Sequence, residues 1–145
     1  MRPTYETEID RDNEQIVFKW VGAEYGCTLI KLKNFNVCDS KIVRDGVQIG
    51  WAEVKRRHNN HDKYTWYKIS DRKWKDLLAI AEADLLPVFL FILFDDGLYQ
   101  VPVISQIRTK VVWGGRTRDQ RDAQDVELMR AFHIKNFRKV AGAPV

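Results

Sequence analysis

Two carboxylates and an ammonium group lie close together in a stretch that otherwise has the composition of β-strands. Asp39 precedes the sequence "RDG", and Glu53 and Lys55 follow it in "WAEVK". Neighbouring carboxylates repel each other unless something neutralises them, and Mg²⁺ can do so while it accepts phosphate oxygens. Lys55 could hold a metal-bound water or stabilise charge on a phosphoryl group. These residue types predict a site that hydrolyses a phosphodiester.

The length of the hairpin turn decides whether the three side chains meet. Because side chains alternate between the two faces of a strand, Glu53 and Lys55 share a face. A two-residue turn at "DG" would pair Asp39 with Ala52 and so put Asp39 on the opposite face. A three-residue turn at "RDG" would pair Asp39 with Trp51 and put it on the same face.

The three-residue turn is the better prediction because it gives each face a consistent chemistry. It groups the three charged residues with Trp51 and leaves small or apolar residues on the other face, namely Cys38, Ser40, Ile42, Gly50, Ala52 and Val54. In this register Asp39 and Glu53 are diagonal neighbours, about 7–8 Å apart at the backbone. We therefore expect the two carboxylates to reach a common ion.

An ordinary solvated strand face with weak ion pairs is the alternative for the same three residues. Two features favour a site. The apolar flanks in "IGWAEV" indicate a central strand, where charged residues are uncommon, and the basic run "KRRHNNHDK" overlaps its end.

Patterns elsewhere predict the elements that must hold the hairpin, which is expected over residues 36–55. Apolar residues at helical spacing predict an amphipathic helix over residues 8–24, ended by Gly26. A second helix is expected over residues 70–84, with Ser70 as its N-cap. The run "PVFLFILF" predicts a central strand, and "LYQVPVI" its partner after the turn "DDG". This order predicts an α/β sandwich with a central mixed β-sheet flanked by helices.

Other stretches carry weaker signals. "CTLIKLKNFNV" is irregular, with room for a short edge strand, and "YTWYKIS" is interpreted as a connection. In the tail, residues 104–145, the polar "GGRTRDQRDAQD" predicts a loop and "LMRAFHI" a short strand. Thr117 and Gln120 could instead form a capping box that opens a helix.

The bulk properties bound the class of protein. With 145 residues, the chain is long enough for one domain with its own core, so we expect a single domain over residues 1–145. The formal net charge of +4 favours a polyanionic partner. No apolar run is long enough to span a membrane, no segment is of signal-peptide type, and Cys27 and Cys38 form no metal-type cluster. A cytoplasmic protein with reduced thiols and no membrane partner is expected.

The stretch "CDSKIVRDGVQIGWAEVKRR" resembles the core of the PD-(D/E)XK nuclease superfamily, which has the restriction-endonuclease-like fold. That family carries an Asp near the start of one hairpin strand and Glu-x-Lys on the next, and these match Asp39 and the Glu53 to Lys55 segment. The resemblance covers about residues 8–103 and implies an αβββαβ core. Cys38 stands where the family name has a proline, at a position that varies within the family.

The resemblance implies an endonuclease that depends on Mg²⁺, with Mn²⁺ as an alternative ion. Asp39, Glu53 and the carbonyl of Val54 would bind the metal. Lys55 would position or activate the attacking water. These four residues are therefore the expected centre of the site.

A helix before the hairpin often supplies a further acidic residue in this family. Glu14 is the best candidate, ahead of Glu6 and Glu24. Its contact with the metal would be through water.

The expected substrate is DNA, with RNA as an alternative. A small nuclease without a specificity domain suits structure-directed cleavage in repair or recombination, of the Holliday-junction-resolvase type, better than restriction. We expect a homodimer in the cytoplasm of a bacterial or phage-infected cell. Two other functions fit the same residues: an inactive nucleic-acid-binding module on this fold, and a protein-interaction module.

Basic and aromatic residues around the hairpin and in the tail are candidates for nucleic-acid contacts, which would make binding depend on salt. They are Arg56, Arg57, Lys63, Tyr67, Lys73, Arg116 and Arg118. The ordinary alternatives are a solvated loop for the arginines and Lys63, a core position for Tyr67 and a helix surface for Lys73. His58 and His61 are spaced to share a transition metal but lack an apparent third ligand.

Overall fold

A computed structural model of the protein describes residues 8–33, 37–115 and 126–142. Within them, the larger of two sheets has the strand order β1-β2-β3-β5-β6-β9. Its strands are β1 (Thr28–Lys31), β2 (Ser40–Arg44), β3 (Val47–Arg56), β5 (Val88–Phe94), β6 (Gly97–Pro102) and β9 (Arg138–Ala141). β3 and β5 are parallel, whereas every other neighbouring pair is antiparallel. The expected mixed sheet is confirmed.

The second sheet corrects the prediction for the tail. Its strands, in the order β4-β8-β7, are β4 (Trp66–Ser70), β8 (Val126–His133) and β7 (Thr109–Gly115). The expected connection "YTWYKIS" therefore contains a strand, β4. The short strand expected at "LMRAFHI" is confirmed as part of β8, whereas β7 was not predicted. The expected loop "GGRTRDQRDAQD" begins with the last two residues of β7, and its remainder lies outside the described residues. The partners β4 and β8 lie far apart in the sequence, so no local pattern indicated their pairing. The capping box proposed at Thr117 and Gln120 lies outside the described residues.

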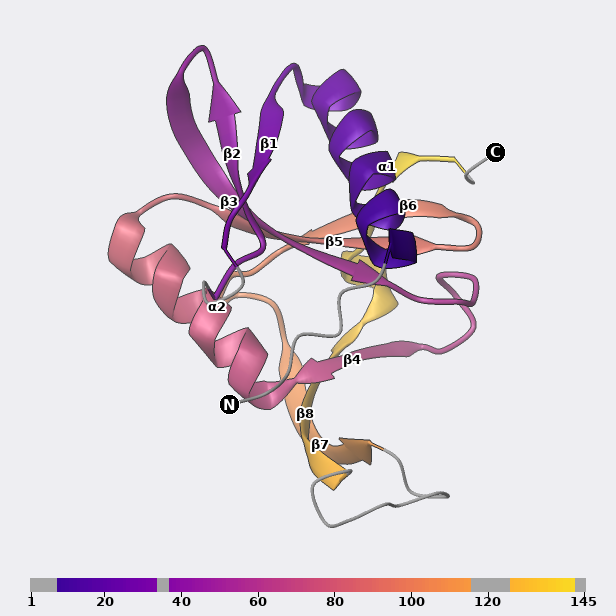
Figure 1. Ribbon diagram of the computed structural model, residues 1–145. Coiled ribbons are helices and arrows are strands. Elements are labelled where there is room, and N and C mark those ends of the chain that lie inside the picture. Colours follow the sequence, from indigo (N-terminus) through magenta and orange to yellow (C-terminus); the bar gives the residue numbers. More distant parts are fainter. Residues whose placement is uncertain (1–7, 34–36, 116–125, 143–145) are drawn as a thin grey trace.

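Helices α1 (Glu8–Tyr25) and α2 (Asp71–Asp84) pack on opposite faces of the larger sheet (Figure 1). The last turn of α1 ends at Gly26, whose φ of +62° suits a residue without a Cβ. On its side of the sheet, α1 buries Val17 and Val21 against Ala52 and neighbouring strand residues. Both helices match their predicted ranges closely.

Helix α2 begins at its predicted cap and shares its side of the larger sheet with the smaller sheet (Figure 1). The Ser70 hydroxyl accepts a hydrogen bond from the Lys73 amide at 3.4 Å. Trp74 and Leu77 are buried in the cluster that contains Phe132 of β8. A fully buried leucine contributes about 1.5–3 kcal/mol, so this packing fixes the first turns of α2 against the sheet.

The β2–β3 hairpin differs from its predicted geometry. Its turn has two residues, Asp45 and Gly46, with φ of +52° and +76°, and it joins the pair Arg44 and Val47. These values are typical of a type I′ turn, for which Asp-Gly is a favoured sequence. The predicted three-residue turn is therefore wrong.

A β-bulge then shifts the register within the same hairpin. Beyond the turn Val43 pairs with Gln48, but Ile42 pairs with Gly50, so Ile49 is the extra residue on β3. The shifted ladder continues to the pair Ser40 and Ala52. One residue further along, position 39 therefore lies opposite position 53. The bulge thus restores the face that the two-residue turn alone would have reversed.

Neither helix in the described part of the chain is long and apolar enough to cross a lipid bilayer.

Candidate active site

Asp39 and Glu53 are held together across the end of the hairpin. The Asp39 amide donates to Glu53 Oε1 at 3.1 Å, and the Val54 amide donates to Asp39 Oδ2 at 2.8 Å. The two residues lie opposite each other rather than diagonally as expected. The expectation that they share a face with Lys55 is confirmed by the register and these contacts.

Two ammonium groups approach the buried carboxylate of Glu53, whose side chain is 2% exposed. Lys73 Nζ lies 3.2 Å from Glu53 Oε2, and Lys55 Nζ lies 3.6 Å from the same oxygen. Lys73 Nζ also donates to the carbonyl of Val37 at 2.6 Å. Lys73 therefore joins the first turn of α2 to the carboxylate and to the segment before β2.

The charge state of Glu53 reflects opposing effects. Burial raises the pKa of Glu53, and the neighbouring Asp39 charge raises it further, whereas Lys55 and Lys73 lower it. A carboxylate without these two cations would be costly to bury. The lysines therefore stabilise a negative charge that the sheet removes from water.

Cys38 occupies a different face from the one predicted. It is 2% exposed and belongs to the apolar cluster with Trp74 and Leu77 on the α2 side, not to the α1 side with Ile42. The bend before β2 breaks the strand alternation there. Burial, followed by the Glu53 charge, raises the pKa of its thiol to about 12, so this thiol stays protonated beside the site.

The oxygen donors at this position fit a hard divalent cation. Mg²⁺ is bound in proteins by one or two carboxylates together with waters and substrate phosphates. Asp39, directly before β2, and Glu53 of β3 supply two carboxylates, and among the described residues no donor is found for Asp39 Oδ1. The Val54 carbonyl lies on the main chain between Glu53 and Lys55 and could supply a neutral oxygen.

Glu14 has a different partner in the structure. Its carboxylate forms an ion pair with Lys31 of β1, with 2.8 Å between Oε2 and Nζ. No contact with Asp39 or Glu53 is found among the described residues. Of the two lesser candidates, Glu24 is exposed near the end of α1, and Glu6 lies outside the described residues.

Arg56 and Arg57 point to opposite faces of β3. Arg56 forms an ion pair with Asp95 at 2.7 Å and donates to the Leu93 carbonyl at 3.0 Å. The Arg57 guanidinium instead lies 5.2 Å from the ring centre of Tyr67. Of these two cations, only Arg57 continues the row that begins with Glu53 and Lys55.

The remaining candidates for nucleic-acid contacts are scattered. Lys63 lies over the exposed ring of Tyr64, 5.5 Å from its centre, and Tyr67 is a buried core residue. Arg116 and Arg118 lie outside the described residues.

His61 has acidic neighbours that the sequence did not indicate. It forms a possible three-ligand group with Asp62 and Asp96, not with His58. Asp96 accepts from the His61 amide and pairs with His61 Nδ1. Although burial acts to raise the pKa of Asp96, these hydrogen bonds lower it. The two contacts between His61 and Asp96 join the β3–β4 loop to the β5–β6 turn.

Comparison with known proteins relates the chain to a protein family and to a solved structure. The phage putative PDDEXK endonuclease family matches residues 1–140. The solved structure of Hjc, a Holliday junction resolvase from the archaeal hyperthermophile Archaeoglobus fulgidus, is similar, with a TM-score of 0.58 and 12% sequence identity, and 90% of each chain is covered. The restriction-endonuclease-like fold is confirmed, with β4 inserted between the third strand and second helix of its αβββαβ core. No curated protein matches the chain.

Proposed function

Because the chain belongs to the phage putative PDDEXK endonuclease family, we propose that it is a metal-dependent endonuclease that hydrolyses DNA phosphodiester bonds. The observation that carries the proposal is the pairing of Asp39 with Glu53, beside the ammonium of Lys55. A solvated strand face would leave these groups in water, whereas Glu53 is 2% exposed.

Asp39, Glu53 and the carbonyl of Val54 would hold the metal, which we propose to be Mg²⁺, with Mn²⁺ as an alternative. The bound ion would supply Lewis-acid stabilisation of the phosphate and a water of lowered pKa. The Asp39–Val54 hydrogen bond keeps one carboxylate aimed at this position. Glu14 would act only through water, since its carboxylate is bound to Lys31.

Hydrolysis adds water across one P–O bond, so the attacking water must lose a proton and the departing oxygen must gain one. Lys55 lies on the same strand face as Glu53, with its ammonium near the Glu53 carboxylate. We assign it the role of orienting the attacking water and stabilising negative charge that develops on the phosphoryl oxygens. Lys73 is assigned a positioning role, because it contacts Glu53 and the Val37 carbonyl together.

The proposed substrate is branched DNA, cut by a homodimer in the cytoplasm of the infected or bacterial cell. The similar solved structure is that of a Holliday junction resolvase, which supports this choice by analogy of fold alone. Family coverage of residues 1–140 supports a single nuclease domain.

A cleavage screen tests the proposal. Four-way junctions, flaps and linear duplexes are incubated with the protein, with and without Mg²⁺ or Mn²⁺. Asp39→Asn, Glu53→Gln and Lys55→Ala are each expected to abolish cleavage, while Asp45→Asn at the exposed hairpin turn leaves it intact. Cleavage that survives all three changes would refute the mechanism, and binding without cleavage would favour an inactive binding module.

A further inference from the structure

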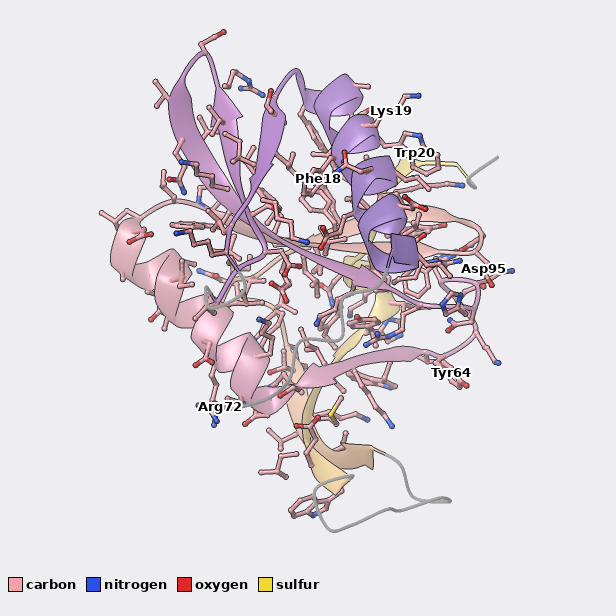
Figure 2. The ribbon with its side chains drawn as sticks, viewed as in Figure 1. Phe18, Lys19, Trp20, Tyr64, Arg72 and Asp95 are labelled. Carbon is pink, nitrogen blue, oxygen red and sulfur yellow. The ribbon has the colours of Figure 1, made fainter. Side chains whose placement is uncertain are left out.

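A pocket of about 640 Å³ lies where β3 leads into β4. Most of its wall comes from residues 57–68, and Phe94, Met129 and Ile134 complete it. Figure 2 shows Tyr64 at the start of β4, at the opposite end of this strand from Arg72 in α2. The lining follows the chain from Tyr64 to Lys68 of β4, with Met129 of the neighbouring strand β8.

One row of side chains connects the carboxylates to this pocket. Glu53, Lys55 and Arg57 are every second residue, so their side chains share one face of the chain. The Arg57 amide donates to the Leu93 carbonyl at 3.0 Å, which extends the pairing with β5 by one residue beyond β3. Four residues of strand span roughly 13 Å. Arg57 lines the pocket, so a strand bound at Glu53 could reach it.

The pocket wall is mostly aromatic and apolar. Tyr64, Trp66 and Tyr67 supply three rings. Tyr64 is 61% exposed, so its ring is available to a ligand. Flat apolar faces of this kind bind nucleobases by stacking, largely without regard to sequence.

Cations lie over these rings. Lys110 Nζ is 3.9 Å from the ring centre of Trp66, and Lys63 covers the Tyr64 ring. Among the described residues, the hydrogen bonds found for the Arg57 side chain are long, 3.4 Å to the carbonyls of Arg56 and Lys68. These cations could shift to phosphates on either side of a stacked base, which a binding site for an apolar molecule would not require.

Tyr67 adds a polar group to the wall. Its hydroxyl is buried and has no hydrogen-bond partner among the described residues. A buried hydroxyl without a partner is costly, and a base edge could supply one.

We propose that this pocket binds an unpaired nucleobase of the DNA strand, within a few nucleotides of the phosphate that is cut. This inference rests on the proposed nuclease function. It identifies the substrate as DNA with an unstacked base next to the cleavage position, as at a branch, flap or mismatch. A fully paired duplex would leave the pocket empty.

Binding measurements without Mg²⁺ test the pocket separately from catalysis. A flap substrate carries 2-aminopurine at its unpaired position, and both its fluorescence and the anisotropy of a remote dye are recorded. Wild-type protein is expected to quench the 2-aminopurine by stacking. Tyr64→Ala is expected to remove the quenching and to weaken flap binding about five- to a hundredfold, with duplex binding unchanged.

Two further variants make the result specific. Thr65→Phe, from an exposed position on the wall, should fill the pocket and give the same loss without removing a packed side chain. Trp113→Ala removes an aromatic residue that is 70% exposed but lies on β7 outside the pocket lining, and it should bind like wild type.

The outcomes separate the two proposals. Unchanged quenching and flap affinity in both Tyr64→Ala and Thr65→Phe would overturn the pocket inference, even if the protein cleaves DNA. Absence of cleavage by the wild-type protein on every substrate would overturn the nuclease function, whereas selective quenching would still support the base pocket.

Discussion

The backbone amide of Asp39 donates to the carboxylate of Glu53, with 3.1 Å between nitrogen and Oε1, so the main chain of one acidic residue fixes the side chain of the other. The side chain of Asp39 is itself held by the Val54 amide. Both acidic groups are therefore oriented by the hairpin itself, which would reduce the ordering that binding of the proposed cation requires.

Asp39→Asn tests this pre-orientation. Asparagine keeps the backbone bond to Glu53 and can still accept from Val54, but it removes a negative charge from the site. Loss of a residue that hydrogen-bonds to a metal ligand lowers metal affinity by roughly 10- to 100-fold. Because Asp39 is itself a proposed ligand, we expect the affinity for Mn²⁺ or Ca²⁺, measured by calorimetry, to fall by more than this. The melting temperature should stay close to that of wild type. Asp45→Asn is the control, and equal affinities in the two variants would argue against a metal site at Asp39.

Lys73→Ala tests the positioning role of the lysine from α2. Loss of its contacts with Glu53 and the Val37 carbonyl should reduce the rate of DNA cleavage by about 10- to 100-fold. Lys75→Ala is the matched control, because Lys75 is an exposed lysine on the same helix that pairs with Asp71. If Lys73 positions Glu53, Lys73→Arg should restore only part of the cleavage rate. If Lys73 acts only by its charge, Lys73→Arg should restore the full rate.

Titration of Glu53 in the metal-free protein should show the opposing charges directly. Since burial and then Asp39 raise its pKa above the usual 4.5, carboxyl ¹³C NMR should give a midpoint above that value. Asp39→Asn should lower the midpoint, and Lys73→Gln should raise it. Midpoints that move in the reverse directions would contradict the arrangement of charges around this carboxylate.

The same shift predicts a pH dependence of stability. A carboxyl whose pKa is raised in the folded state gives its full stabilisation below the unfolded value and loses it as the pH rises through the folded value. Glu53→Gln should therefore be more stable than wild type at pH 7, by a few degrees in melting temperature, and this advantage should disappear in acid. A melting temperature for Glu53→Gln below that of wild type at pH 7 would show that the two lysines outweigh the burial.

Asp71 is expected to behave in the opposite way. Burial acts to raise its pKa, but hydrogen bonds from Lys75 and Arg130 produce a net lowering, and Arg130 of β8 contacts it at 2.6 and 2.8 Å. Its contribution is therefore present above the usual value of 3.8 and is lost as the pH falls through the lowered pKa. Asp71→Asn should reduce the free energy of unfolding by about 1.5–3 kcal/mol at pH 7, with little effect in strong acid. Equal urea midpoints at pH 7 would contradict this prediction.

Arg56 and Arg57 provide a matched pair for salt dependence. Arg57 lies on the face of the carboxylates, whereas Arg56 is bound to Asp95. Arg57→Gln should lower the slope of log affinity against log salt by about 1, and Arg56→Gln should change it less. Anisotropy titrations at several salt concentrations measure both slopes, and a larger change for Arg56→Gln would place the DNA on the other face.

Local patterns were sufficient for the elements whose periodicity or caps are strong. The apolar run of β5, buried on both faces, and the Ser70 cap of α2 are visible in the sequence itself. β8 was predicted as a short strand, but β4 and β7 were missed, because the β4–β8 pairing joins segments far apart along the chain. Lys73 was predicted to contact nucleic acid. Its contact with Glu53 could not be predicted from the sequence, because it depends on where α2 packs against the sheet.

The hairpin shows how a correct result can follow from a wrong detail. Both the predicted turn and the observed turn with a bulge put Asp39 and Glu53 on one face. Each moves the pairing of the two strands by one residue from that of a simple two-residue hairpin, in opposite directions. Two signals were available for the true geometry: Asp45-Gly46 favours a two-residue turn, and an isolated glycine inside a strand, here Gly50, indicates a bulge.

The extra residue at Ile49 has a consequence for how this hairpin can change over evolution. Removing that one amino acid would straighten the ladder and turn the acidic group at position 39 toward α1, away from its counterpart. A change of one residue in the length of this segment would therefore separate the two carboxylates and abolish the proposed activity, although the sheet could still form. Changes of two residues would keep both side chains on one face. Alignments of relatives should show gaps of even length in this segment.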